Sequence, residues 1–300
     1  MVRRSSAGAL AALALATLSP AATAAAQQFP VTVKAANGRV TIPERPKRIV
    51  VLGPSHTETL YAIGAGRQVV AVDDQSNHPR RAPQTRLSSH RPNAEAVARY
   101  RPDLVVTSTR ANGLLPALRR LRIPVVLGPA ATHIGGAYEQ MKQLGSATGH
   151  RPAADRLIRR MRRRIDRAVR SAPRARGLSV FHELTPDLFS ATSRTFIGRV
   201  YRLFGLRNIA DAARGAGTPY PQLSAEFVIS ANPGLIVLAD TRCCGQNLAT
   251  VRRRPGWRSL SAVRRGRVLA LDDDIPSRWG PRIADFVEQI ARAVGRTRSR

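Results

Sequence analysis

Short apolar runs alternate with amphipathic segments along the first half of the chain. Ile49–Leu52, Val69–Val72 and Val125–Leu127 are continuous apolar runs, a pattern that predicts buried strands. Thr57–Ile63 and the region around Leu114–Leu121 carry apolar residues at helical spacing. Strands that alternate with helices indicate parallel βαβ units with right-handed crossovers.

The same alternation restarts after one long amphipathic segment. Ala153–Ser171 has an apolar face at helical spacing, which predicts a helix that crosses between two lobes. The strands expected beyond it are Leu178–Phe181, Leu235–Leu238 and Arg267–Leu271, and the helices are Phe196–Phe204 and Pro281–Val294. The expected fold is therefore α/β, with two Rossmann-like lobes of parallel sheet joined by one stiff helix. We place the N-terminal lobe at 27–150, the connecting helix at 151–173 and the C-terminal lobe at 174–300.

One sequence unit occurs twice. Asn93–Val97 is followed by Pro102–Val106, and Ser224–Val228 is followed by Pro233–Val237. Each copy has a polar cap, a glutamate in the first turn of a short helix, a proline stop and an apolar strand. Two matched lobes imply a cleft between them, where small ligands commonly bind.

The N-terminus indicates export. Arg3 and Arg4 precede the apolar run Ala7–Leu18, and Ala24–Ala26 supplies a small-residue cleavage site. We therefore predict that residues 1–26 are a secretory signal peptide and that the protein is soluble and periplasmic. No cysteine follows the cleavage site, so a lipid anchor is not expected.

The formal charge is +30, and Lys34, Lys47 and Lys142 are the only lysines. Such a balance raises the hypothesis of a polyanion partner. The densest run of arginines, however, lies on the amphipathic segment at 151–176, where they form its solvated face. Few aromatic residues and no recognition motif accompany them, so nucleic acid is not an expected partner.

Histidines cluster in the predicted loops at the carboxyl ends of the strands, where ligands gather in parallel sheets. Neutral imidazole is a common ligand of transition metals. The candidates for direct metal coordination are His56, His78, His90, His133 and His182. The alternative is that these side chains only hydrogen-bond an organic chelate or stay solvated.

Cys243 and Cys244 are the only cysteines and follow a predicted strand. In an oxidising compartment they form either a vicinal disulfide, which gives a ligand an apolar ledge, or a thiolate metal site. Ser55 beside His56 suggests a hydrolase, but the surrounding Gly53–Thr57 lacks the second glycine of a nucleophile elbow. An enzyme is therefore not expected.

Nearly the whole chain from Pro46 to Ala293 resembles the periplasmic binding proteins of ABC importers for iron siderophores, haem and cobalamin, and is most similar to the cobalamin-binding branch. The segments that carry the resemblance are Arg48–Val50, Ser55–Glu58, Arg101–Val106, Tyr220–Ser224, Pro255–Trp257, Gly266–Val268 and Arg278–Arg282. The resemblance implies a carrier that holds a metal chelate in a shallow cleft, needs no resident cofactor and works as a monomer with an inner-membrane permease.

The resemblance also implies residue roles. Glu95 and Glu226 correspond to the glutamates that pair with permease arginines. Tyr220 matches an aromatic residue that stacks on the ligand, and Asp274 and Arg278 match polar ligand contacts. The whole set expected at the ligand is Ser55, His56, Gln75, His78, His90, Tyr220, Cys243, Cys244, Asp274 and Arg278.

Two departures concern the ligand itself. Gln75 and His78 stand where the cobalamin branch has aromatic residues, which removes stacking surface for a corrinoid. The expected function is capture of a cobalamin-, siderophore- or haem-like chelate for an ABC permease. A binder of a bare transition metal ion is the alternative, and a periplasmic hydrolase is a weaker one.

Overall fold

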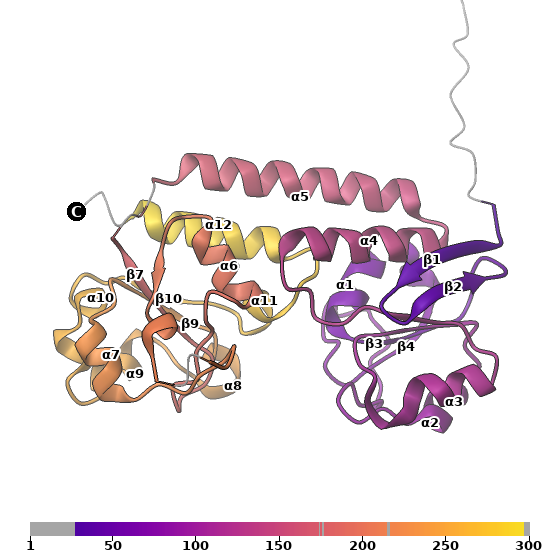
Figure 1. The fold of residues 1–300 in the computed structure, drawn as a ribbon, viewed down its shortest axis with the longest axis horizontal. Coiled ribbons are helices and arrows are strands. Elements are labelled where there is room, and N and C mark those ends of the chain that lie inside the picture. Colours follow the sequence, from indigo (N-terminus) through magenta and orange to yellow (C-terminus); the bar gives the residue numbers. More distant parts are fainter. Residues whose placement is uncertain (1–27, 174, 176, 215–216, 297–300) are drawn as a thin grey trace, which may run out of the picture.

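The computed structural model describes residues 28–296 except 174, 176 and 215–216. The expected signal peptide, residues 1–26, lies outside the described residues. Two lobes lie side by side, each with its own sheet, and one long helix runs along the same side of both (Figure 1).

The N-terminal lobe begins with an antiparallel hairpin and continues as a parallel sheet. The hairpin pairs β1 (Val31–Ala35) with β2 (Gly38–Ile42). The sheet has the order β4-β3-β5-β6, and all its strand pairs are parallel. Its strands are β3 (Ile49–Leu52), β4 (Val69–Val72), β5 (Leu104–Thr107) and β6 (Val125–Leu127). The helices are α1 (Pro54–Ala62), α2 (Ala94–Ala98), α3 (Leu114–Arg120) and α4 (Ile134–Thr148), with short 3₁₀ turns η1 (Ala65–Gln68) and η2 (Ala111–Gly113).

The C-terminal lobe repeats this plan. Its parallel sheet has the order β10-β9-β7-β8. The strands are β7 (Ser179–Glu183), β8 (Arg207–Asn208), β9 (Leu235–Leu238) and β10 (Val268–Ala270). The helices are α6 (Phe196–Arg202), α7 (Ala225–Ala231), α8 (Thr241–Cys244), α9 (Leu248–Arg253), α10 (Ser261–Arg264), α11 (Asp274–Ser277) and α12 (Ile283–Gly295), with 3₁₀ turns η3 (Ile209–Ala212) and η4 (Trp257–Ser259).

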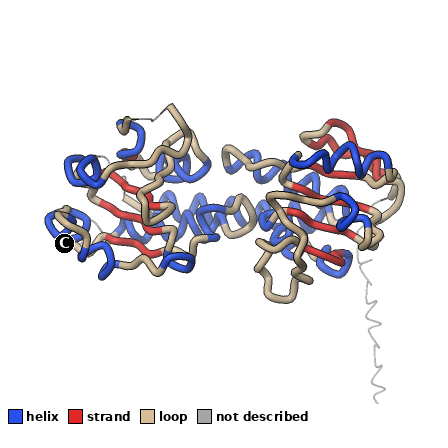
Figure 2. The backbone as a smooth tube through the Cα atoms, turned by 90° about the horizontal axis from the view of Figure 1, so that it is seen from below, coloured by secondary structure: helices blue, strands red, loops and turns tan. Residues whose placement is uncertain are grey.

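The two sheets share one topology. In chain order, each lobe places its strands as second, first, third and fourth across the sheet. The duplicated sequence unit supplies the third strand in both lobes, through α2 and β5 and through α7 and β9. The residue before each unit's proline, Arg101 or Asn232, has a positive φ, of 48° and 42° respectively. The repeat in the sequence is therefore a repeat in space (Figure 2).

The connecting helix α5 (Arg151–Ser171) fastens the lobes together. Its buried side chains, among them Leu157, Met161 and Ile165, pack against α4 of one lobe and α12 of the other. One apolar cluster continues under α5 from the N-terminal into the C-terminal lobe, and each lobe has a smaller core on the opposite face of its sheet. The two lobes thus share one apolar core along the side that α5 covers.

Several helices differ from the sequence-based expectation, and the short helices α8, α9, α10 and α11 were not expected. α1 begins at Pro54 and not at Thr57, because proline is well suited to the first helical position. α4 was not predicted, since Gly135 and Gly136 open it and lower its helix propensity. His133 starts α4 by accepting a hydrogen bond on Nδ1 from Gly136 N at 2.8 Å.

Within the described residues, no helix combines the length and the hydrophobicity needed to cross a membrane.

Candidate functional site

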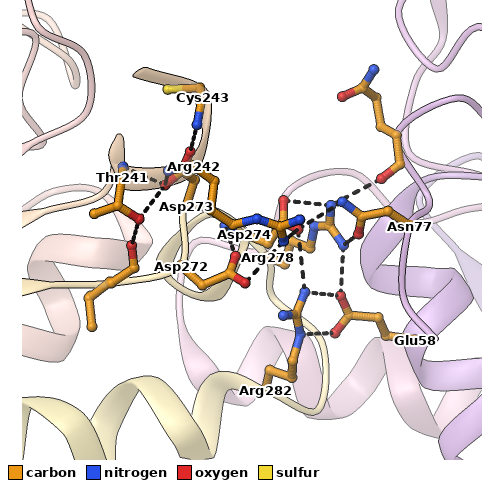
Figure 3. Close-up of polar contacts among 12 residues, drawn as sticks. Glu58, Asn77, Thr241, Arg242, Cys243, Asp272, Asp273, Asp274, Arg278 and Arg282 are labelled. Atoms are coloured by element: carbon orange, nitrogen blue, oxygen red, sulfur yellow. Dashed lines mark hydrogen bonds and ion pairs between the residues drawn. The ribbon is translucent and has the colours of Figure 1, made fainter. Parts of the chain in front are cut away.

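A buried polar network joins the lobes. Glu58, on α1, accepts hydrogen bonds from Arg278 Nη1 at 3.0 Å and from Arg282 Nη2 at 2.6 Å and Nε at 3.0 Å. Its side chain is 2% exposed and that of Arg278 is 7% exposed. The contact spans the lobes, since the carboxylate comes from one and both guanidiniums from the other (Figure 3).

Arg278 makes three further hydrogen bonds. Arg278 donates to Asn77 Oδ1 at 2.9 Å, to the Gln75 carbonyl at 3.0 Å and to Asp274 Oδ1 at 2.6 Å. Asp274 Oδ2 accepts from Asn77 Nδ2 at 3.0 Å. We call Glu58, Asn77, Asp274, Arg278 and Arg282 the interlobe network.

Part of the expected ligand set lies in this network. Arg278 and Asp274, which the resemblance places at the ligand, connect the lobes here, and their contact with ligand stays a prediction. Ser55 is buried, and its Oγ accepts from the Trp279 backbone N–H at 3.1 Å, a further interlobe contact. Gln75 joins through its carbonyl oxygen while its side chain is exposed. Sequence reasoning missed Asn77 and Arg282, because partners about 200 residues away leave no local signal.

Two of the five candidate histidines lie inside the protein. His56 sits in the first turn of α1, 2% exposed, with Nε2 at 2.7 Å from the Gly128 carbonyl, and burial lowers its pKa to about 4. His182 is fully buried in β7, with Nδ1 at 2.6 Å from the Tyr201 hydroxyl, and burial lowers its pKa to about 3. Both are neutral interior side chains without access to a ligand at the surface.

The other three histidines are exposed but separate. His78 and His90 lie on the loop that follows β4, whereas His133 caps α4. No group of three or more His, Cys, Asp or Glu side chains able to hold a metal ion occurs among the described residues. The structure thus does not bring the five histidines together.

The cysteines form a bonded pair. Cys243 and Cys244 are joined as a vicinal disulfide at the exposed end of α8. Asp273 holds this helix: its carboxylate accepts from the backbone N–H groups of Thr241 at 2.7 Å, Arg242 at 3.0 Å and Cys243 at 2.8 Å (Figure 3). A carboxylate at a helix N-terminus is stabilising, so Asp273 stabilises the start of α8.

Exposed aromatic side chains lie on neighbouring loops. Tyr220 is 50% exposed and Phe189 is 37% exposed. Their loops are paired through a bridge between Phe189 and Gln222. Phe189 follows β7, the disulfide follows β9 and Asp273 follows β10, so three adjacent strands bring them to one edge of the sheet. We call Phe189, Tyr220, Cys243 and Cys244 the aromatic–disulfide face.

The glutamates of the repeat occupy equivalent places. Glu95 and Glu226 are exposed in the first turns of α2 and α7, which Asn93 and Ser224 cap at 2.9 and 3.1 Å. Both helices lie on the side of their lobes away from α5 (Figure 1). Hydrogen bonds from its own backbone and from Ser224 lower the pKa of Glu226. Among the described ion pairs, neither glutamate has a partner.

Known proteins share the sequence of this chain over most of its length. The family model described as periplasmic binding protein matches residues 49–275. The chain belongs to this family. A cobalamin-binding protein of Halobacterium salinarum is 32% identical over 280 residues, 90% of this chain and 75% of the relative. An uncharacterized ABC transporter substrate-binding lipoprotein of Bacillus subtilis is 30% identical over 277 residues, 89% of this chain and 86% of the relative.

A solved structure agrees with the fold. The periplasmic vitamin B12 binding protein of Vibrio cholerae matches with a TM-score of 0.71 and 25% identity, covering 84% of this chain and 98% of that one. The family is one of substrate-binding proteins that work with ABC permeases, so the expectation that the chain is not an enzyme is confirmed. In the structure, the Ser55 hydroxyl accepts from the Trp279 backbone N–H, and His56 Nε2 contacts the Gly128 carbonyl oxygen.

Proposed function

We propose that this protein captures a metal chelate of the corrinoid type in the periplasm and delivers it to an inner-membrane ABC permease. The observation that carries the proposal is the matched placement of Glu95 and Glu226 on equivalent helices of two lobes with one topology. Such a pair suits a permease with two-fold symmetry, because each lobe presents the same charge to one half.

The aromatic–disulfide face supports binding of a large flat ligand. Tyr220 and Phe189 offer ring faces for stacking, and the disulfide adds a rigid apolar contact. His78 and His90 are exposed on the loop after β4 of the opposite lobe, and we expect them to approach the metal of a chelate. The names of the relatives favour a corrinoid over haem or a siderophore.

Equilibrium binding of cyanocobalamin to the purified protein tests the ligand class. We expect one saturable site, and affinity reduced at least about ten-fold in Tyr220→Ala, since base- or ring-stacking contacts are worth about 1–3 kcal/mol. Leu121→Ala removes another exposed apolar side chain, on the far side of the N-terminal lobe after α3, and serves as the matched control. Saturable binding of haemin or a ferric siderophore, without binding of cyanocobalamin, would identify that chelate as the ligand and contradict the corrinoid proposal.

A bare metal ion is the second candidate. The exposed His78 and His90 on one loop are the observation that favours it. Calorimetry with Co²⁺, Fe³⁺ or Zn²⁺ alone distinguishes the two, because the chelate proposal predicts no tight binding of the free ions. Tight binding that is lost in His78→Ala with His90→Ala would favour the ion.

A further inference from the structure

A buried acidic cluster underlies the disulfide helix in the C-terminal lobe. Glu183, the last residue of β7, is fully buried and accepts from Arg254 Nη1 at 2.6 Å and from Nη2 at 2.5 Å. Arg254 also donates to Gln246 Oε1 at 2.7 Å and lies over the Trp257 ring at 4.5 Å. This guanidinium is therefore committed to Glu183, and Trp257 lies against the same cluster.

A second carboxyl group lies in the cluster without a counter-charge of its own. Asp240 directly precedes α8 and is fully buried, and neither of its carboxyl oxygens receives a hydrogen bond from a described donor. Glu183 pairs with Leu238 across β7 and β9, and Ala239 N donates to the Glu183 carbonyl oxygen at 2.9 Å, so Asp240 directly follows the residues paired with Glu183. Two buried carboxylates beside one guanidinium leave an uncompensated negative charge, which is costly, whereas one proton between them removes the charge and supplies the missing hydrogen bond.

We propose that Asp240 and Glu183 hold one proton between them and that this shared proton is a positioning device for α8, the helix that carries the Cys243–Cys244 disulfide. Loss of the proton sets two carboxylates against each other, and Asp240 is joined directly to Thr241 at the start of α8. The disulfide then shifts relative to the rest of the aromatic–disulfide face. The effect on ligand rests on the proposed function, but the shared proton does not.

Charged groups around the pair agree with this assignment. Burial first, and then the Glu183 charge, raise the pKa of Asp240 to about 7, while Arg254 lowers it. His182 precedes Glu183 on β7 and points to the other face of the sheet, where it meets Tyr201. At the same N-terminus of α8, burial acts to raise the pKa of Asp273, but hydrogen bonds from Arg242, Cys243 and Thr241 bring it below its usual value. Asp273 is thus an ionised neighbour that does not share the proton.

The fluorescence of Trp257 tests for the shared proton, and the experiment needs no ligand. The chain has two tryptophans, so Trp279→Phe leaves Trp257 as the only one. Its fluorescence is followed from about pH 5 to about pH 9, a range in which ordinary carboxyl groups are already ionised. We expect a transition near pH 7 in this parent, no such transition in Asp240→Asn, and a transition moved below about pH 5 in Glu183→Gln, where Asp240 faces Arg254 alone.

Asp273→Asn is the matched control, because it also removes a carboxylate at α8 and should keep the transition. Absence of a transition in the parent, or an unchanged transition in Asp240→Asn, overturns the shared proton.

Cyanocobalamin affinity at about pH 6 and about pH 8 then tests the positioning role: we expect at least about a three-fold change in the native protein and none in Asp240→Asn. A pH-independent affinity in the native protein refutes the positioning role. A lack of cyanocobalamin binding at either pH counts against the proposed function, and the Trp257 result still decides whether the proton is shared.

Discussion

Glu58 and Arg278 form a buried ion pair at 3.0 Å although 220 residues separate them in the sequence. Arg282 binds the same carboxylate, so one acid of the N-terminal lobe holds two arginines of the C-terminal lobe. Together with the core shared under α5, this contact fixes the relative position of the lobes at their junction. The carrier is therefore expected to bind and release its ligand through local shifts in loops more than through a wide hinge motion.

Replacement of Glu58 by glutamine should destabilise the protein strongly. The change removes the carboxylate that Arg278 and Arg282 share and leaves Asp274 as the acid beside both guanidiniums. Loss of one partner of a buried ion pair costs about 3–5 kcal/mol. Urea denaturation measures the loss. Arg242→Gln is the control, since Arg242 is 62% exposed in its pair with Asp272 and its loss should cost within about 1 kcal/mol. Equal losses in the two variants would show that the interlobe network contributes little.

Acid should destabilise the protein through its buried histidines. The pKa of His182 is lowered to about 3 in the folded protein, so the imidazole stays neutral while the unfolded chain binds a proton below about pH 6.5. The stability this histidine provides is complete above about pH 6.5 and is lost as the pH falls toward about 3.

Urea denaturation of the native protein and His182→Gln at about pH 7 and about pH 4.5 measures the difference. The native protein should lose about 2 kcal/mol more than the variant on acidification. The raised pKa of Asp240 gives the opposite pH dependence, because the stability that this group contributes is lost as the pH rises toward about 7. This contribution is the same in both proteins. The same loss in both would contradict a neutral buried His182.

Several parts of the fold were predictable because their signals are local. Asn93 and Ser224 cap α2 and α7 as the repeat indicates, and β3, β4, β6 and β9 have the predicted bounds. These features depend on neighbours within a few residues, where capping and apolar runs determine the structure.

The site was harder to predict because its contacts are distant in sequence. Arg278 has the residue type of a ligand contact, but the partners that bury it come from α1 and from the loop after β4. His56 was assigned to a loop because the start of α1 was placed three residues too late. The sequence does place the cysteines after the strand that ends at Leu238, which is where the structure has them.

Reversal of the charge on both repeat glutamates should separate binding from delivery. Glu95→Lys with Glu226→Lys should leave ligand affinity unchanged, because both side chains are exposed and neither belongs to the aromatic–disulfide face. Transport in cells or vesicles that contain the cognate permease should be abolished by charge repulsion.

The matched control is Glu44→Lys with Glu139→Lys. These glutamates are also exposed, and the change in net charge is the same. We expect the control to transport nearly normally. Uptake that is equal in the two double variants would remove the docking role from Glu95 and Glu226.

Reduction of the disulfide should weaken ligand binding. Opening the Cys243–Cys244 bond replaces a rigid apolar contact with two mobile thiols, so we expect cyanocobalamin affinity to fall several-fold in the presence of a phosphine reductant. Cys243→Ser with Cys244→Ser should match the reduced protein and show no response to the reductant. Unchanged affinity in both would exclude the disulfide from the ligand site.

Native mass spectrometry of the protein mixed with cyanocobalamin, haemin and a ferric siderophore tests the central claim most directly. The account predicts a single complex with one cyanocobalamin per protein monomer, with the ligand's covalent mass unchanged. Observation of only the free protein, or of a chemically altered ligand, would contradict a carrier that binds a metal chelate without reaction.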